Sequence, residues 1–165
     1  MKKTIILNFE NIKIEGNVLD VACESLDIIS SISQEVQDEI AVDYVEKEES
    51  NKLKNSKYDA CTFFFNLHSL RNIGKREKLI NEISSYIGEG SSIYIWDINK
   101  NIGELIDVKL RILLPKDEVR EYSVKNNNLF SSSSFEETKK IIEKAFEIEE
   151  AKIWEDLYFI KGTKK

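Results

Sequence analysis

The chain has 165 residues, 41% of them hydrophobic, and a formal net charge of -6. This length is typical of one domain, and the hydrophobic share is enough for a core. Without clustered Lys and Arg, the negative charge argues against nucleic acid as a partner, because that binding relies on cations that contact phosphates. The apolar run after Lys3 stops at Asn8, too early for a signal peptide, and no run approaches the ~20 residues of a membrane span. We therefore expect one cytoplasmic domain over residues 1–165, with no membrane partner.

The two cysteines, Cys23 and Cys61, lack the spacing of metal ligands. A secreted disulfide framework would use more cysteines than two. We therefore expect both thiols to be reduced and buried, and we predict no metal site.

The first part of the chain reads as strands and helices in turn. Residues 17–22 form a short apolar run that predicts a buried strand, and the isoleucines that follow recur with helical spacing as far as Val36. Residues 39–43 predict a second strand that ends at a carboxylate. The polar stretch 46–57 predicts a short helix or a loop. Residues 58–66 are almost continuously apolar, which is typical of a parallel strand covered on both faces.

The same alternation continues to residue 97. Residues 76–87 carry an apolar stripe that predicts an amphipathic helix, with Gly88 as its left-handed cap, and residues 92–97 predict another strand. Alternating strands and helices favour parallel pairing with right-handed crossovers. The phenylalanines of the strand at 58–66, together with Trp96 and Trp154, are predicted to lie in the core.

The segment 101–133 has a looser pattern. Residues 110–114 and 119–124 flank a Pro-Lys-Asp-Glu sequence, and they predict either a hairpin or two helical turns. Both alternatives remain open on the sequence.

The last segment, 134–162, begins with a helix signal. Ser134 is followed three residues later by Glu137, which is the pattern of a capping box. The strands predicted at 147–154 and 157–161 are separated by two residues, which favours an antiparallel pair.

Taken in order, these segments resemble the class I S-adenosylmethionine-dependent methyltransferases. Residues 18–27 resemble the first motif, a strand that enters a glycine-rich turn, and residues 40–43 resemble the second strand, whose terminal acid binds the cofactor ribose. Residues 58–70 resemble the fourth strand and the loop beyond it. Residues 88–97 resemble the Pro-Gly-Gly turn and strand five, and 134–161 resemble the C-terminal helix and antiparallel pair.

The resemblance implies a three-layer Rossmann-like α/β fold with a mostly parallel sheet and an antiparallel C-terminal strand. Only fourteen residues separate Asp43 from Tyr58, too few for helix, strand three and helix. We therefore expect strand three to be missing and the strand order to be 2-1-4-5-7-6. Residues 17–100 would form the cofactor half, 101–133 a variable insertion and 134–162 the C-terminal part.

The chain departs from the family in the turn after the first strand. Ala22, Glu24 and Leu26 stand where the family has glycines that let the backbone approach the cofactor. The Glu24 carboxylate would also repel the methionine carboxylate of the cofactor.

The resemblance implies S-adenosylmethionine as the cofactor. His68, the single histidine, follows the fourth strand and is a candidate general base, although a lone surface histidine is the common alternative. Asp97 ends another strand at the same crevice. A carboxylate or amide at a strand end can also serve only to cap a turn. The predicted cofactor-binding residues are Asp20, Ala22, Cys23, Asp43 and Asn66, and the catalytic candidates are His68 and Asn66.

Two functions are compatible with these observations. The first is methyl transfer to an unknown small molecule, and the second is a degenerate methyltransferase fold that serves in binding or assembly. Loss of strand three would expose strand two as an edge, so a homo-oligomer through that edge or through residues 104–124 is compatible with the sequence. A nicotinamide dinucleotide site is excluded because the chain has no G-x-G-x-x-G.

Overall fold

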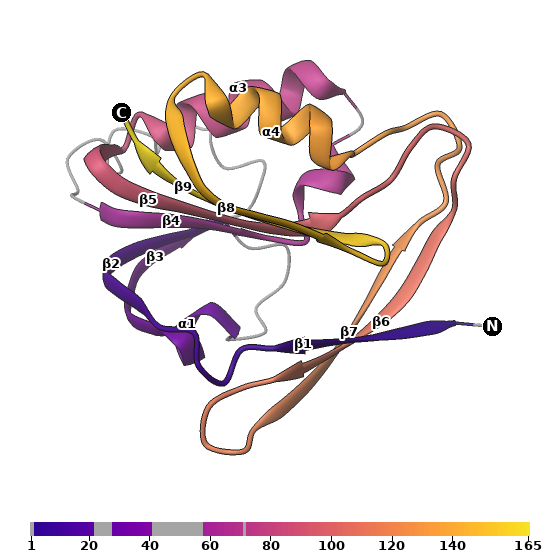
Figure 1. Ribbon diagram of the computed structural model, residues 1–165, viewed down its shortest axis with the longest axis horizontal. Helices are drawn as coiled ribbons and strands as arrows, with labels where there is room; N and C mark the ends of the chain where they lie inside the picture. The colour runs from indigo at the N-terminus through magenta and orange to yellow at the C-terminus, as the bar shows by residue number, and fades with distance from the viewer. Residues whose placement is uncertain (1, 22–27, 41–57, 71) are drawn as a thin grey trace.

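The computed structural model describes residues 2–21, 28–40, 58–70 and 72–165 of the chain. The described residues form two β-sheets, with helices α3 and α4 on one side and α1 on the other (Figure 1). In chain order, the elements are β1 (Lys3–Asn8), β2 (Ile14–Val21), α1 (Ile28–Ile32), β3 (Ser33–Ile40), β4 (Tyr58–Phe64), the 3-10 turn η2 (Leu67–Ser69), α3 (Ile73–Ser84), β5 (Ile87–Ile98), β6 (Ile106–Leu113), β7 (Val119–Asn126), α4 (Phe135–Glu143), β8 (Phe146–Trp154) and β9 (Leu157–Lys164).

The main sheet has the strand order β3-β2-β4-β5-β9-β8. Strand β2 pairs in parallel with β3 and β4, and β4 pairs in parallel with β5. Strand β9 is antiparallel to both β5 and β8. The predicted mostly parallel sheet with an antiparallel C-terminal strand is therefore confirmed. The prediction that strand three is missing concerns residues 41–57, which lie outside the described residues.

Helices α3 and α4 cover one face of the main sheet, as Figure 1 shows. Their apolar stripes pack on alternate residues of β2, β4, β5 and β9 in one buried cluster. The predicted capping box is present, because Ser134 accepts from the Glu137 backbone and Glu137 accepts from the Ser134 backbone. The helix predicted at 76–87 begins one turn earlier, at Ile73, and ends at Ser84.

Gly88 was expected to cap α3 in the left-handed conformation, and this expectation is wrong. Gly88 belongs to β5 and its φ is not positive, whereas Gly90 has a φ of 81°. The helix ends earlier because Ile87 already pairs with Tyr58 at the start of β4, so that its backbone is extended.

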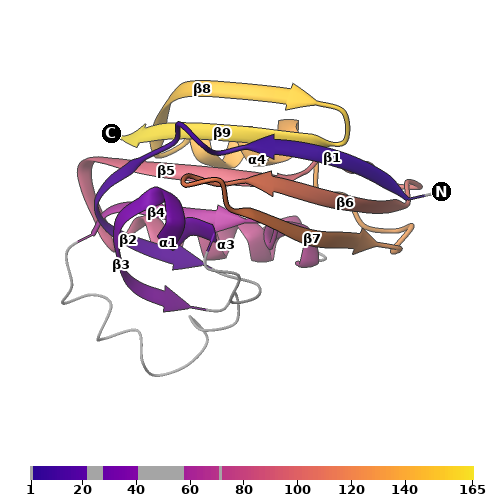
Figure 2. The ribbon, with the colours of Figure 1, turned by 90° about the horizontal axis from the view of Figure 1, so that it is seen from below.

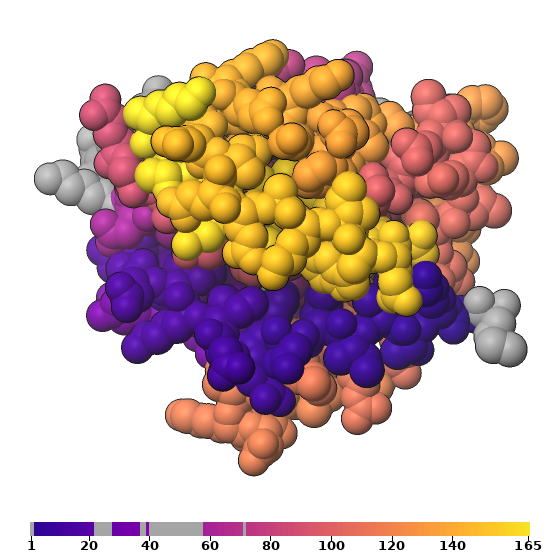
Figure 3. Space-filling model, viewed as in Figure 1, coloured from indigo at the N-terminus to yellow at the C-terminus, as the bar shows by residue number. Residues whose placement is uncertain are grey.

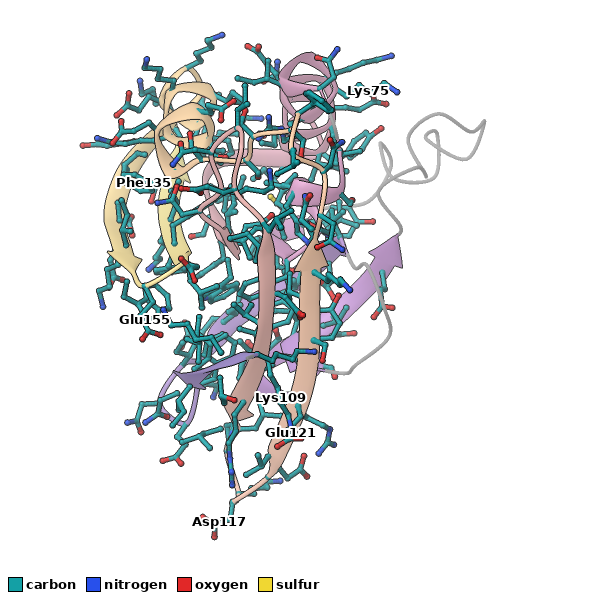
Figure 4. The ribbon with its side chains drawn as sticks, turned by 90° about the vertical axis from the view of Figure 1, so that its right-hand side faces the viewer. Lys75, Lys109, Asp117, Glu121, Phe135 and Glu155 are labelled. Atoms are coloured by element: carbon teal, nitrogen blue, oxygen red, sulfur yellow. The ribbon has the colours of Figure 1, made fainter. Side chains whose placement is uncertain are left out.

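A second, three-stranded sheet covers much of the opposite face (Figure 2). Its order is β1-β6-β7, with β1 parallel to β6 and β6 antiparallel to β7. The segments 110–114 and 119–124 thus form the hairpin, one of the two alternatives left open by the sequence. Figure 4 shows Lys109 and Glu121 on its two strands and Asp117 at its tip. The Lys109 ammonium lies 2.8 Å from the Glu121 carboxylate.

Strand β1 was not predicted as an element. Its side chains alternate, since Ile5 and Leu7 are buried whereas Ile6 is 60% exposed. Such alternation is the signature of a strand with one buried face, but the run Thr4 to Leu7 is too short to show it clearly.

The helical spacing predicted as far as Val36 holds only up to Ile32, where α1 ends. Residues 33–40 form β3, so the strand predicted at 39–43 begins several residues earlier, at Ser33, and residues 41–43 lie outside the described residues. Within β3, Val36 pairs with Val18. Pairing with β2 supplies a ladder of backbone hydrogen bonds, which overrides a weak local preference for helix.

Cys61 lies on β4 and is fully buried as a free thiol. Burial raises the pKa of this thiol, which keeps it protonated and unreactive. The expectation of a buried, reduced cysteine is confirmed for Cys61, whereas Cys23 lies outside the described residues.

Helix α3, with 12 residues, is the longest helix among the described residues. No helix in these parts of the chain has the length and apolar character needed to cross a membrane.

Candidate functional site at the carboxyl ends of the parallel strands

The carboxyl ends of β2, β4 and β5 lie at one edge of the main sheet because these strands are parallel. In α/β sheets ligands bind beyond this edge. Asp20 is the penultimate residue of β2, Asn66 follows the end of β4, and Asp97 is the penultimate residue of β5. The fold thus places three of the residues that the sequence singled out at the same end of neighbouring strands.

Ala22, Cys23 and Asp43 lie outside the described residues, as do Glu24 and Leu26 of the same turn. Their assignment to the cofactor stays a prediction.

Asp20 is almost completely buried, with 6% of its surface exposed. Its carboxylate accepts a hydrogen bond of 2.6 Å from the hydroxyl of Thr62, at the paired position on β4. Burial raises the pKa of Asp20 to about 7, the hydrogen bond from Thr62 opposes this rise, and the nearby charge of Glu39 adds to it. The Asp20 carboxyl therefore changes its charge near neutral pH, which is common for functional groups and unusual for structural carboxylates.

Asn66 is fully buried and connects the ends of two neighbouring strands. Its side-chain nitrogen donates to the backbone oxygen of Val21 on β2, whereas its Oδ1 has no hydrogen-bond partner among the described residues. Phe65, directly before it, has a φ of 52°. A positive φ costs a bulky residue ~1–3 kcal/mol, and such backbone strain is concentrated at functional sites.

Asp97 lies on the helix-covered face and is fully buried. Its carboxylate accepts from the backbone nitrogens of His68, at 3.1 Å, and of Ile98, at 2.7 Å. Burial raises the pKa of Asp97, while the charge of His68 and these backbone hydrogen bonds oppose the rise. Asp97 therefore holds the η2 turn, and with it His68, against the end of β5.

The His68 side chain is half-buried, so it is not the fully exposed surface histidine of the common alternative. Its Nδ1 is buried and has no hydrogen-bond partner within the described part of the chain. Its backbone oxygen accepts from the side chain of Asn126 at the end of β7, at 3.1 Å. The small sheet is thus tied to the carboxyl edge of the main sheet.

A partly buried charged pair joins the two helices behind this edge. Arg76 on α3 is 1% exposed, and its guanidinium lies 3.4 Å from the carboxylate of Glu137 on α4. Below them, the hydroxyls of Thr138 and Tyr158 are hydrogen-bonded at 2.9 Å. Burial raises the pKa of Tyr158, and the charge of Asp97 adds to this rise.

Lys100 is fully buried in the segment that follows β5. Its ammonium donates to the backbone oxygens of Asn128, at 2.8 Å, and Ser131, at 2.5 Å. This single charge therefore fixes the loop between β7 and α4 beside the carboxyl edge.

Sequence reasoning missed Thr62, Arg76 and Lys100. Arg76 does carry a signal, because it precedes Leu79 and Ile80 at helical spacing and so occupies the buried stripe of α3. Thr62 is a polar residue inside an apolar strand. A polar residue at a buried position is the informative observation in both cases.

Among the described residues, no three His, Cys, Asp or Glu side chains are grouped to hold a metal ion. The Asp20 carboxyl and the Asn66 Oδ1 at this end of the sheet are both hydrogen-bond acceptors.

The comparisons with known proteins bear on the fold. No protein-family model matches the sequence, and a search of curated proteins gives no match. Solved structures do match. A S-adenosylmethionine-dependent methyltransferase from Clostridium acetobutylicum ATCC 824 is 9% identical, with a TM-score of 0.56 over 93% of this chain and 85% of that chain.

Two further structures agree with this match. A S-adenosylmethionine-dependent methyltransferase from Methanosarcina mazei is 14% identical, with a TM-score of 0.55 over 93% of this chain and 94% of that one. The N-methyltransferase NodS from Bradyrhizobium japonicum WM9 is 10% identical, with a TM-score of 0.54 over 90% of this chain and 85% of that one. Together with the mostly parallel sheet, these matches show that the chain has the fold of the class I S-adenosylmethionine-dependent methyltransferases.

Proposed function

We propose that this chain binds S-adenosylmethionine at the carboxyl edge of the main sheet and transfers its methyl group to a small molecule. One observation carries the proposal. Asp20 on β2 and Asn66, just after the neighbouring parallel strand β4, bring a buried carboxyl and a buried acceptor without a described partner to the edge where this fold binds ligands.

The charge of the cofactor fits these groups. S-adenosylmethionine carries an ammonium and a sulfonium, and when bound it supplies an activated methyl group. An ammonium near Asp20 would favour the ionised carboxylate, and the Asn66 Oδ1 would accept a hydrogen bond from it. Asp43 would hold the ribose, as the resemblance implies, and Ala22 and Cys23 would line the turn.

Methyl transfer from a sulfonium requires few catalytic groups from the protein. Holding the acceptor atom in line with the methyl group accounts for much of the rate of such a transfer. His68 is the candidate that would take a proton from the acceptor, through its imidazole. Asn66 would orient the reactants.

The second candidate is a binding or assembly module with the same fold. The residues Ala22, Glu24 and Leu26 favour it, because they place side chains where the family leaves room for the cofactor. Within the described residues β3 is an edge of the main sheet, where a second copy could pair, or two copies could meet through residues 104–124. This candidate predicts a dimer in light scattering and no response to the cofactor.

Titration calorimetry and thermal unfolding with S-adenosylmethionine and S-adenosylhomocysteine test the proposal. At 100-fold excess over the Kd, a ligand adds ~2.7 kcal/mol to the stability of the folded state, which corresponds to a rise of about 5–10 °C in Tm for a chain of this size. Asn66→Ala should weaken binding, whereas Asn127→Ala, in an exposed loop, should not. If neither compound binds at millimolar concentration, the first candidate is wrong.

A double variant separates two reasons for such a failure. If Glu24→Gly with Leu26→Gly binds the cofactor and the original chain does not, the side chains of the turn close the site. Failure of both chains would leave the assembly module as the function that the fold supports.

A further inference from the structure

A pocket of about 550 Å³ lies between β1 and the side of the main sheet formed by β5, β9 and β8. Its size is within the ~300–1,000 Å³ of small-molecule sites. In Figure 3 the N-terminal segment, in indigo, adjoins β8 and β9, in orange and yellow, on the face toward the viewer. The pocket is lined by none of the four candidate residues at the carboxyl edge, Asp20, Asn66, His68 and Asp97.

The pocket follows from the unequal widths of the two sheets. Three strands cannot cover a face made of six, and β1 and β8 are edge strands of their sheets in the described part of the chain. Figure 2 shows β1 as the strand of the small sheet that lies toward β8 and β9. The part of the main sheet beyond β1 is therefore left without a covering strand.

Aromatic rings line this pocket. Trp96 stacks on Phe159, with ring centroids 5.0 Å apart and planes at 25°, and on Tyr94, at 5.9 Å and 14°. Phe9, directly after β1, packs against Trp96 with ring centroids 5.1 Å apart. Trp154, which was expected in the core, is only half-buried and lines the pocket. Stacked rings of this kind favour a flat aromatic ligand.

The charged residues of the lining are mostly cations. Lys13, Lys152 and Lys161 contribute to the pocket, against one carboxylate, that of Glu150. This excess of lysine contrasts with the net charge of -6 for the whole chain. Lys152 is paired with Glu150 at 2.7 Å and Lys161 with Glu149 at 3.2 Å, whereas Lys13 has no carboxylate partner within the described residues. Ion pairs this exposed are weak, so the anion of a ligand can replace these partners.

We infer that this pocket binds a flat aromatic molecule that carries an anionic group, with the ring on the aromatic lining and the anion at the lysines. The site is separate from the carboxyl edge of the parallel strands, and the inference does not depend on methyl transfer.

Intrinsic fluorescence tests this inference directly, because the two tryptophans of the chain, Trp96 and Trp154, both line the pocket. The probes are 4-nitrobenzoate, 4-nitrobenzyl alcohol and protonated 4-nitrobenzylamine, which have the same ring and differ in charge. We expect saturable quenching, with the anion bound at least about tenfold more tightly than the cation, a difference of ~1.4 kcal/mol. Quenching that does not saturate, or equal binding of the three probes, would overturn the inference.

Two double variants with the same change in charge provide the control. Lys13→Glu with Lys152→Glu should weaken binding of 4-nitrobenzoate about tenfold, or ~1.4 kcal/mol, and strengthen binding of the amine. Lys75→Glu with Lys140→Glu alters exposed lysines of the helices on the other face, where Figure 4 places Lys75, and should leave both affinities unchanged. Circular dichroism checks that both variants fold.

Equal losses in the two double variants would show an effect of net charge alone and would overturn the inference. Competition by S-adenosylhomocysteine would place the probe at the carboxyl edge and would overturn it as well. Failure of the chain to bind S-adenosylhomocysteine, by contrast, would contradict only the proposed methyl transfer.

Discussion

From the buried carboxyl of Asp20 we predict how the free energy of unfolding of the protein depends on pH. Its pKa is about 7 in the folded protein against an ordinary value of 3.8. Below pH 3.8 the group is protonated in both the folded and the unfolded state. Between pH 3.8 and 7 the unfolded state loses this proton while the folded state keeps it, so the free energy of unfolding falls as the pH rises.

The size of this loss follows from the shift in pKa. A difference of about three units, at ~1.4 kcal/mol per unit, lowers the free energy of unfolding by ~4 kcal/mol between pH 4 and pH 8. Asp20→Asn removes the charge and keeps an oxygen that can accept from Thr62. Its NH₂ group needs a new partner, which costs ~1–3 kcal/mol at every pH. The variant should therefore be less stable than the original chain near pH 4 and more stable by ~1–3 kcal/mol at pH 8.

Urea unfolding followed by circular dichroism at several pH values between 4 and 8 measures this difference. Asp107→Asn is the control, because the Asp107 side chain is 48% exposed, and its stability profile should run parallel to that of the original chain. If the profile of Asp20→Asn also runs parallel, the Asp20 carboxyl is not buried as described and the reasoning fails. Under the proposed function, the same variant should bind S-adenosylmethionine at least about tenfold more weakly, or ~1.4 kcal/mol, despite its higher stability at pH 8.

Three further substitutions test the structure, two of them beside the site and one at the opposite end of β2. Asp97→Ala leaves the buried nitrogens of His68 and Ile98 without their acceptor, so urea unfolding should show a loss of ~2–4 kcal/mol, and a loss below ~1 kcal/mol would contradict these contacts. Lys100→Met frees two loop carbonyls, so limited proteolysis should cut within 126–133 faster than in the original chain; equal rates would mean that this lysine does not hold the loop. Gly16→Ala forces a φ of 82° on a residue with a side chain and places its Cβ 2.4 Å from a carboxylate oxygen of Asp59, so a cost of at least ~1–3 kcal/mol is expected, and an unchanged urea midpoint would refute it.

The candidate site was predicted in part. Asp20, Asn66 and Asp97 could be placed at one edge because each stands at the end of an apolar run, and the ends of parallel strands coincide. Their partners could not be predicted. Thr62 lies 42 residues from Asp20, and the pairing of β2 with β4 sets their contact.

Local patterns also determined most of the main sheet. Residues 58–66 and 92–97 read as strands, and the helix at Ser134 was marked by its capping box, because each signal lies within a few neighbouring residues. The helix predicted as far as Val36 was wrong for residues 33–36, which belong to β3, because the signal that forms a strand here is not local. A spacing that satisfies a helix over two turns also allows a strand, and the neighbouring strand decides between them.

The sequence by itself thus determined the alternation of strands and helices, and it placed Asp20, Asn66 and Asp97 at one end of the sheet. The tertiary structure decided what covers the second face, since β1 pairs Lys3 with Val108, across more than a hundred residues. No periodicity within a short window encodes such a contact, which depends on how two apolar surfaces fit together. The pocket between β1 and β8 follows from the same fit, because its position depends on how far the small sheet extends across the large one.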